Sequence, residues 1–423
     1  MNSKKIFSFN LFFETFKQIR AIGIIGTLLM VGLSIVPNIF NAMENGMMLE
    51  SMGGDEIVSH AVTVEIVSEY FFLCFVFLLF APLLTMSVLK FLNDRKMSDF
   101  YHSLSYSRNC LYISRLLAVI VWVFIILAVS YVANVIAYTV MAEYFRVDFY
   151  TLFRMHLSVF IGSLLVIAVF SVGCAITGNV INNIVISGLI LLLPRGIIQI
   201  VTGAVQQMTM MVPAENAISF ISHSQNIVAS WVMMTFMEIR AISAQQLFLS
   251  IESNVYTLVL AVIYIVLGFV LFKVRKSEAA GKALGSNKVA FVVKAIVAAS
   301  IASVGIIQVI ADAYNRTDLS EEMKISFVTS VLTSLMVSMA VVVIYEYASV
   351  KKAFKYKSTF LSVVSGWGGA VVLGILVVVA AKAVVSYVPA KEDVNYVKIM
   401  NSDSIGMSYD EMAYFDAVTS DIK

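Results

Sequence analysis

The chain has 423 residues, of which 60% are hydrophobic and only 13% charged, and its mean hydropathy is +0.90. Soluble domains carry roughly 25% charged residues, so this composition excludes an ordinary soluble domain and favours a chain that crosses a bilayer several times. The formal net charge of +2 says little, because the distribution of charge matters more than its sum in a membrane protein. No nucleic acid is expected as a partner.

The first 20 residues predict a basic amphipathic helix on the inner leaflet of the membrane. Apolar residues recur three to four positions apart with basic residues among them: Ile6, Phe9, Phe13, Phe16 and Ile19 alternate with Lys4, Lys5, Lys17 and Arg20. The apolar run that follows lacks the small-residue cleavage site of a signal peptide. A frayed polar leader is the alternative interpretation.

Nine apolar runs are long enough to form membrane-spanning helices. We place them near Ala21–Asn41, Ser68–Leu89, Leu116–Val140, Leu157–Thr177, Ile181–Gly203, Val255–Phe272, Val289–Ala311, Ile325–Ile344 and Leu361–Ser386. The region Ala204–Asn254 is also apolar but is interrupted, which favours re-entrant or surface-lying helices. The sequence therefore predicts an all-α polytopic membrane protein of about nine spans.

Basic residues set the predicted orientation, because basic loops remain on the cytoplasmic side. With the N-terminus inside and the C-terminus outside, nineteen basic residues lie inside and five lie in the short outer loops. The loop Ala42–Val67 is acidic and holds no Lys or Arg, in agreement with an outer position. We expect the bacterial cell membrane as the location.

The segment Lys90–Arg115 lies between the second and third spans, on the predicted inner face. It carries five basic and two acidic residues, with aromatic residues at intervals. A loop that is partly charged and partly aromatic can form a docking surface for another protein. The alternative is an ordinary solvated loop whose aromatic side chains lie at the lipid interface.

The sequence offers little support for catalysis. No P-loop is present, because Gly281-Lys282 is followed by Ala283 and Lys276 occupies the first glycine position. The three cysteines form no CxxC pair, and the four histidines are scattered outside any HExxH motif. We therefore expect neither an enzyme nor a metal or cofactor site in this chain.

Arg195 is the most unusual charge within a span. A central Arg costs roughly 2.5–3.5 kcal/mol in membrane insertion, which the Leu, Ile and Val residues around it offset with about 0.3–0.6 kcal/mol each. Arg195 is flanked by Pro194 and Gly196, which suggest a local break in the helix. A substrate path could be lined by Arg195, Gln199, Asn182, Asn183 and Asn134. A purely structural arginine is the alternative.

One glycine pattern predicts helix packing. Gly366, Ala370 and Gly374 lie four residues apart within the last apolar run, so they fall on one face of a helix.

Two stretches resemble one family. The K-S-x-D-F-Y-H-S-L-P-x-S-R segment of multidrug-type permeases from low-GC Gram-positive bacteria is similar to Lys96-Met97-Ser98-Asp99-Phe100-Tyr101-His102-Ser103-Leu104, followed by Ser107-Arg108. The R-K-x-E-x-A-G-K stretch of that family is similar to Arg275-Lys276-Ser277-Glu278-Ala279-Ala280-Gly281-Lys282. The order of elements over residues 1–275 also resembles the permease subunit of ATP-binding-cassette (ABC) exporters of the type-2 class.

This resemblance implies a permease subunit that is driven by a separate cytoplasmic ABC ATPase, which would bind the ATP and Mg²⁺. It also implies a second permease, as a homodimer or heterodimer, and contact with membrane lipids. The segment that couples the permease to the ATPase would then comprise Phe100, Tyr101, His102, Ser103, Leu104 and Arg108.

The resemblance divides the chain into a six-span core (1–275), three additional spans (276–386) and a short extracellular tail (387–423). Two features depart from the family pattern. Ser105 replaces a usual proline, and the sequence ends at Lys423, where family members often continue into a larger extracellular domain. Residues 387–423 would then be a stub of that domain, or the chain would be a shortened member.

Two other functions stay open at this point. A membrane sensor or assembly protein would use the outer regions to bind a ligand or partner and the inner loops as output. An ion-driven or proton-driven carrier would need paired acids in mid-span and an inverted repeat, and neither is evident in the sequence.

Overall fold

The computed structural model describes residues 6–51, 72–104, 106–142, 148–209, 226–236, 248–275, 280–281, 287–314, 321–350 and 356–385. Of these residues 92% are helical, and no β-strand occurs among them. The prediction of an all-α chain is confirmed.

Eight of the described helices are long and apolar enough to cross a membrane, so the chain is a multi-pass membrane protein. They are α2 (Arg20–Ser51), α6 (Arg108–Val140), α7 (Phe149–Ile176), α8 (Val180–Thr209), α12 (Ile251–Val274), α13 (Asn287–Tyr314), α14 (Glu321–Val350) and α15 (Tyr356–Val385). Each contains most of one predicted span.

The remaining predicted span, Ser68–Leu89, is described only from residue 72. A π-helical turn, η1 (Val76–Phe80), leads there into α4 (Ala81–Val88), which carries Pro82 in its first turn. The apolar helix Val76–Val88 is shorter than a bilayer crossing requires. The ninth span stays a prediction.

The shorter helices agree with the sequence pattern. α1 (Phe9–Gln18) buries Leu11 and Thr15 and exposes Phe9 and Phe13, as expected of an amphipathic helix. Within the region Ala204–Asn254, α10 (Ile227–Phe236) is only ten residues long and is too short to span a bilayer.

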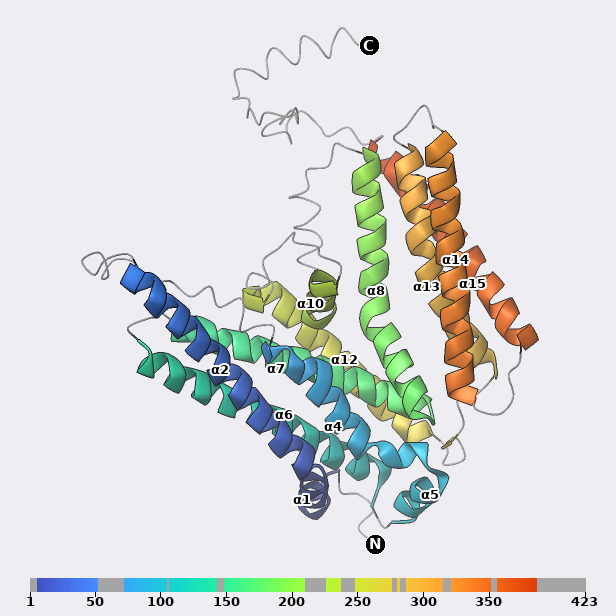
Figure 1. Cartoon of the computed structure of the whole chain (residues 1–423). Coiled ribbons are helices and arrows are strands. Elements are labelled where there is room, and N and C mark those ends of the chain that lie inside the picture. Colours follow the sequence, from blue (N-terminus) through green and yellow to red (C-terminus); the bar gives the residue numbers. More distant parts are fainter. Residues whose placement is uncertain are drawn as a thin grey trace, which may run out of the picture.

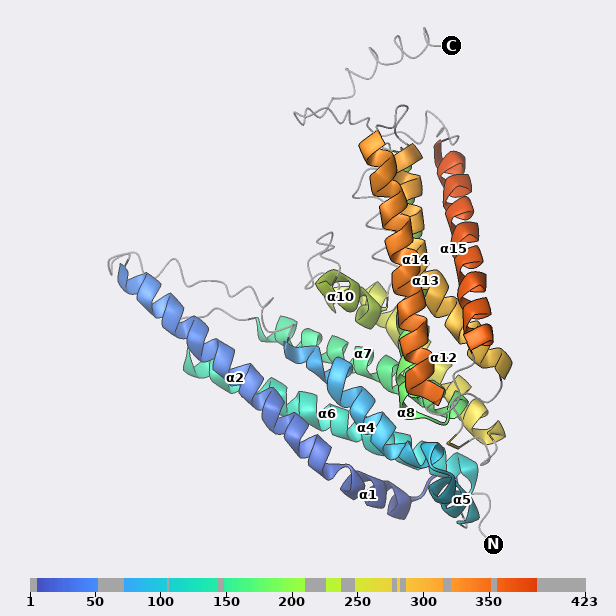
Figure 2. The same cartoon turned by 45° about the vertical axis from the view of Figure 1, so that its right-hand side comes forward.

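The long helices form two groups that are inclined to each other. In Figures 1 and 2, α2, α4, α6, α7 and α12 lie in one group, and α13, α14 and α15 lie alongside α8 in the other. α8 contacts both α7 and α13, so it joins the two groups. Although the resemblance places α8 in the six-span core, α8 also packs against α13, α14 and α15.

The predicted glycine face of α15 packs on α13. Ala370 is buried, and Gly366 lies so close to α13 that an added Cβ would be 2.5 Å from the carbonyl oxygen of Ala295. Residues without bulky side chains therefore allow these two helices to approach closely. The prediction of a packing face is confirmed.

Two small helices follow α4 and lead the chain to one end of the first group (Figure 1). They are the 3-10 helix η2 (Lys90–Asn93) and α5 (Arg95–Ser103). The last eight residues of the predicted loop, 108–115, belong instead to α6, because the Ser107 hydroxyl caps that helix by accepting a hydrogen bond from the backbone N–H of Cys110 (3.2 Å).

Candidate functional site

α5 begins at a well-formed N-cap. Asp94 has an extended backbone, and its Oδ1 accepts hydrogen bonds from the backbone N–H groups of Lys96 (2.8 Å) and Met97 (3.3 Å). Such a cap is worth about 1 kcal/mol, which matters for a helix of nine residues that would be unstable alone. Because the cap is local, α5 requires other contacts to be held against the rest of the molecule.

The outer face of α5 combines apolar and charged side chains. Met97 is 45% exposed and Phe100 is 56% exposed, and Arg95, Lys96 and Asp99 are exposed beside them. The outer face of α5 thus presents one aromatic ring and one methionine among charged side chains.

The inner face of α5 is attached through Tyr101. Its ring centroid lies 4.9 Å from that of Phe91 on η2, and the guanidinium carbon of Arg115 on α6 lies 4.1 Å from the centroid of Tyr101. Arg115 is almost fully buried and donates a hydrogen bond to the carbonyl of Val88 (2.7 Å). This cation–π contact therefore connects α5 to both α4 and α6.

Arg275 forms a second connection at this end of the molecule. Its side chain is buried and donates hydrogen bonds to the carbonyl oxygens of Cys174, Ala175 and Thr177 and, at 2.7 Å, to that of Leu92. Three of these carbonyls lie at the C-terminal end of α7, where helix geometry leaves them without intrahelical partners and where a cation is favoured.

Arg275 keeps its charge in this position. Burial lowers the pKa of its guanidinium to about 10, which is still well above neutral pH. Arg275 thus links η2, which directly precedes α5 in the chain, to the C-terminal end of α7.

Arg108, at the start of α6, ties the same region to α12. Its Nη1 donates hydrogen bonds to the carbonyl oxygens of Lys273 (2.7 Å) and Arg275 (2.8 Å), at the C-terminal end of α12. Together, Arg108, Arg115 and Arg275 connect the ends of α4, α6, α7 and α12 around η2 and α5. We call these three residues the arginine clamp.

The connection between α12 and α13 also reaches this end. The backbone N–H of Gly281 donates a hydrogen bond to the carbonyl of Gly178 (3.1 Å), in the turn between α7 and α8. Gly281 has a φ of +77°, which favours glycine because it has no Cβ.

The residues predicted to contact an ATPase separate into two sets. Phe100 is exposed, whereas Tyr101 and Arg108 bind other parts of the chain. Leu104 is half-buried, and the Ser103 hydroxyl donates a hydrogen bond to the carbonyl of Phe100 (2.7 Å). The side chain of His102 lies outside the described residues.

Two residues of the predicted substrate path take part in contacts between elements. Asn182 accepts a hydrogen bond from the Tyr345 hydroxyl on α14 (2.7 Å). Asn183 accepts one from the Thr177 hydroxyl and donates one to Asn93 (3.3 Å). These two neighbours on α8 therefore contact different elements.

Of the other three predicted path residues, Asn134 is buried on α6 and Arg195 is buried on α8. The side chain of Gln199 lies outside the described residues. A common path lined by all five residues stays a prediction.

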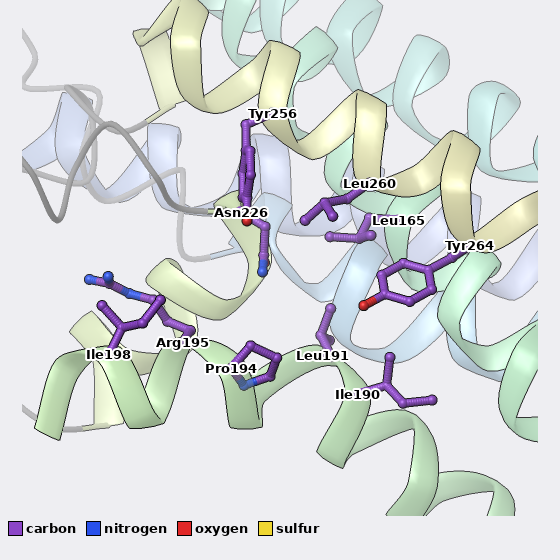
Figure 3. Close-up of a pocket in the computed structure, with 10 residues that line it drawn as sticks. All are labelled: Leu165, Ile190, Leu191, Pro194, Arg195, Ile198, Asn226, Tyr256, Leu260 and Tyr264. Carbon is purple, nitrogen blue, oxygen red and sulfur yellow. The ribbon is translucent and has the colours of Figure 1, made fainter. Parts of the chain in front are cut away.

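Arg195 lines a cavity of about 80 Å³ between α7, α8 and α12. Figure 3 shows Pro194 and Arg195 on α8, with Tyr264 of α12 at the other end of the lining and its hydroxyl group directed toward α8. The remaining polar residues of the lining are Asn226 and Tyr256. The cavity has room for water, which needs about 10–15 Å³ when measured in the same way.

A buried ion pair joins the three additional helices. Lys294 Nζ on α13 lies 3.2 Å from Glu346 Oε2 on α14 and 3.3 Å from Thr359 Oγ1 on α15, and both charged side chains are less than 7% exposed. Sequence reasoning missed this pair, because 52 residues separate its members and each lies toward one end of its apolar run. An ionisable residue within a span, as here, is the one signal that could have indicated it.

Comparisons with models of protein families, with curated proteins and with solved structures find no match to this chain. Within the part of the chain that the structure describes, no three His, Cys, Asp or Glu side chains gather where a metal ion could bind.

Proposed function

We propose that this chain is the permease subunit of an ABC transporter of the bacterial cell membrane and that α5 docks into a separate cytoplasmic ATPase. The ATPase subunit would bind and hydrolyse ATP with Mg²⁺, and this chain would supply the path for the substrate, together with a second permease. The N-terminus and α5 would face the cytosol, and the C-terminus would face the exterior.

The observation that supports this proposal best is the two-sided character of α5. Its outer side presents Phe100 and Met97, and its inner side is attached by Tyr101 to the arginine clamp. A short helix that presents an apolar side chain to a groove of its partner is a common mode of recognition. Because the clamp holds the ends of α7 and α12, a force on α5 would reach the long helices directly.

The resemblance to type-2 exporters agrees with this arrangement. In that comparison, Phe100 and Leu104 belong to the coupling segment, and Arg275 and Gly281 belong to the second shared stretch. Arg275 contacts η2 and accepts a hydrogen bond from Arg108 of the first stretch, and Gly281 contacts the α7–α8 turn.

The test of the proposal is whether an ATPase co-purifies with the protein. The full chain is purified from its native membranes in mild detergent, and Mg-dependent ATP hydrolysis is measured in the purified sample. We expect Phe100→Ala to lose most of the co-purifying activity, because the central aromatic residue of a docking surface is commonly worth 2 kcal/mol or more.

Phe124→Ala serves as the matched control. Phe124 lies on α6, within a predicted span, and is 58% exposed, compared with 56% for Phe100. The control should keep the activity of the unaltered protein. Equal activity in the Phe100→Ala sample, or no ATP-hydrolysing partner in the unaltered sample, would contradict the proposal and favour a sensor or assembly protein.

A further inference from the structure

A polar cavity of about 500 Å³ opens between α1, the start of α2, α5 and α6. This volume lies within the range of roughly 300–1,000 Å³ that is usual for small-molecule sites. The polar side chains that line the cavity are Glu14, Thr15, Lys17, Gln18, Arg20, Tyr101 and Arg115.

The charge of this cavity is positive. Lys17, Arg20 and Arg115 contribute three cations, and Glu14 is the one acid of the lining. Glu14 lies 3.8 Å from Lys17, and both side chains are more than 60% exposed, so this pair is weak. Arg20 is exposed as well.

Arg115 makes the inner wall of the cavity unusual. Its side chain is 2% exposed, its Nε has no hydrogen-bond partner, and among the described residues no carboxylate forms an ion pair with it. Arg115 donates a hydrogen bond to the Val88 carbonyl, and its guanidinium lies over the rings of Phe91 and Tyr101. A buried charge with no counterion is costly, and an anion in the cavity would offset that cost.

The position of α1 indicates where such an anion would come from. Figures 1 and 2 show α1 beside α5 at one end of the first helix group. Ile6, Phe9 and Phe13 are 62%, 70% and 52% exposed. Side chains of this kind enter the boundary between headgroups and acyl chains, which puts Lys17 of the same helix, and Arg20 just after it, at the depth of the lipid phosphates.

We propose that this cavity binds the phosphate of an anionic phospholipid headgroup. Lys17 and Arg20 would hold the phosphate at the cavity mouth, and the positive charge of Arg115 would favour it from below. Because Tyr101 contacts Arg115, a bound lipid would also brace α5. The inference rests on the cavity alone and does not depend on ATP-driven transport.

The experiment titrates the purified full chain in detergent with short-chain phosphatidylglycerol, short-chain phosphatidylcholine or inorganic phosphate, and measures binding by native mass spectrometry. The altered protein is Lys17→Gln/Arg20→Gln. Arg95→Gln/Lys96→Gln is the matched control, because it removes two exposed cations of α5 that do not line the cavity.

We expect phosphatidylglycerol to bind the unaltered protein and the control alike, and to bind the Lys17→Gln/Arg20→Gln protein roughly thirtyfold more weakly. Equal affinity for phosphatidylcholine, or unchanged affinity in the Lys17→Gln/Arg20→Gln protein, would overturn the proposal. Inorganic phosphate that binds as tightly as phosphatidylglycerol would identify a free anion as the ligand and would also overturn it.

Discussion

Among the described side chains near α5, that of Arg275 makes the most hydrogen bonds to other elements. Its donors satisfy carbonyl oxygens at the end of α7 and on η2, which lie far from it in the sequence. Arg275→Gln would leave several of these buried carbonyls unpaired, and each unpaired polar group costs about 1–3 kcal/mol.

We therefore expect Arg275→Gln to lower the free energy of unfolding by about 3 kcal/mol, as measured by thermal unfolding in detergent. Arg275→Lys should recover part of this loss, because it keeps the charge but lacks the planar set of donors. The exposed Arg95→Gln should change the stability by less than about 0.5 kcal/mol. A similar small effect for Arg275→Gln would show that the clamp does not hold the helix ends together.

The Lys294–Glu346 pair gives a different prediction, because its two charges compensate each other in a buried place. Removing one charge leaves the other without compensation, which costs about 3–5 kcal/mol. We expect Lys294→Met and Glu346→Leu each to destabilise the protein to this extent, and the double variant to lose much less than the sum of the two. Strictly additive losses in thermal unfolding would contradict direct coupling between the two side chains.

At the level of the elements, the packing of α15 on α13 depends on a glycine. A Cβ at position 366 would lie 2.5 Å from a backbone oxygen and 2.7 Å from the Cβ of Ala298, so the helices would have to move apart. At position 368, by contrast, a Cβ would meet nothing within 4 Å.

We expect Gly366→Ala to destabilise the protein by about 1–3 kcal/mol, the usual cost of overpacking. Gly368→Ala should be neutral or slightly stabilising, because alanine is the better helix former and the added methyl group has space. Thermal unfolding of the two variants, compared with the unaltered chain, measures the difference. Equal stability of both variants would show that α13 and α15 are not in close contact.

The sequence was sufficient to predict the long helices but not the residues at which they begin and end. Hydropathy identifies the apolar part of a span, but a helix continues until its backbone groups are capped. α6 thus begins at Arg108, eight residues before the predicted Leu116, because Ser107 supplies the cap. The part of the second span described here is irregular for a local reason, a π-turn next to Pro82.

The docking role of Lys90–Arg115 stays a prediction. The structure shows that this segment contains η2 and α5, with Phe100 exposed on α5. The partners of Arg115 and Arg275 were not predictable, because the carbonyl groups that they bind belong to helix ends up to 183 residues away. Contacts of this kind depend on tertiary packing and leave no periodic signal in the sequence.

For the whole molecule, the two helix groups meet at α8. The first half of α8 contacts α7 on one side, and on the other side Ile186 packs with Val293 of α13 and Tyr345 of α14. A displacement of α5 would pass through Arg275 to α7 and from there to α8. Under the proposed transport function, we expect the three additional helices to move with α8 as one body, in the manner of transporters that rock rigid helix bundles.

The central claim, that α5 faces the cytosol and docks an ATPase there, is tested most directly by thiol labelling of Asp99→Cys, which puts a thiol on the exposed face of α5 and keeps Phe100 in place. The three native cysteines are buried, so an added thiol on the exposed face of α5 would dominate the reaction. We predict that a membrane-impermeant maleimide labels this residue in inside-out vesicles stripped of peripheral proteins but not in intact cells, and that vesicles retaining the ATPase are protected. Labelling in intact cells, or labelling that is the same with and without the ATPase, would contradict the account.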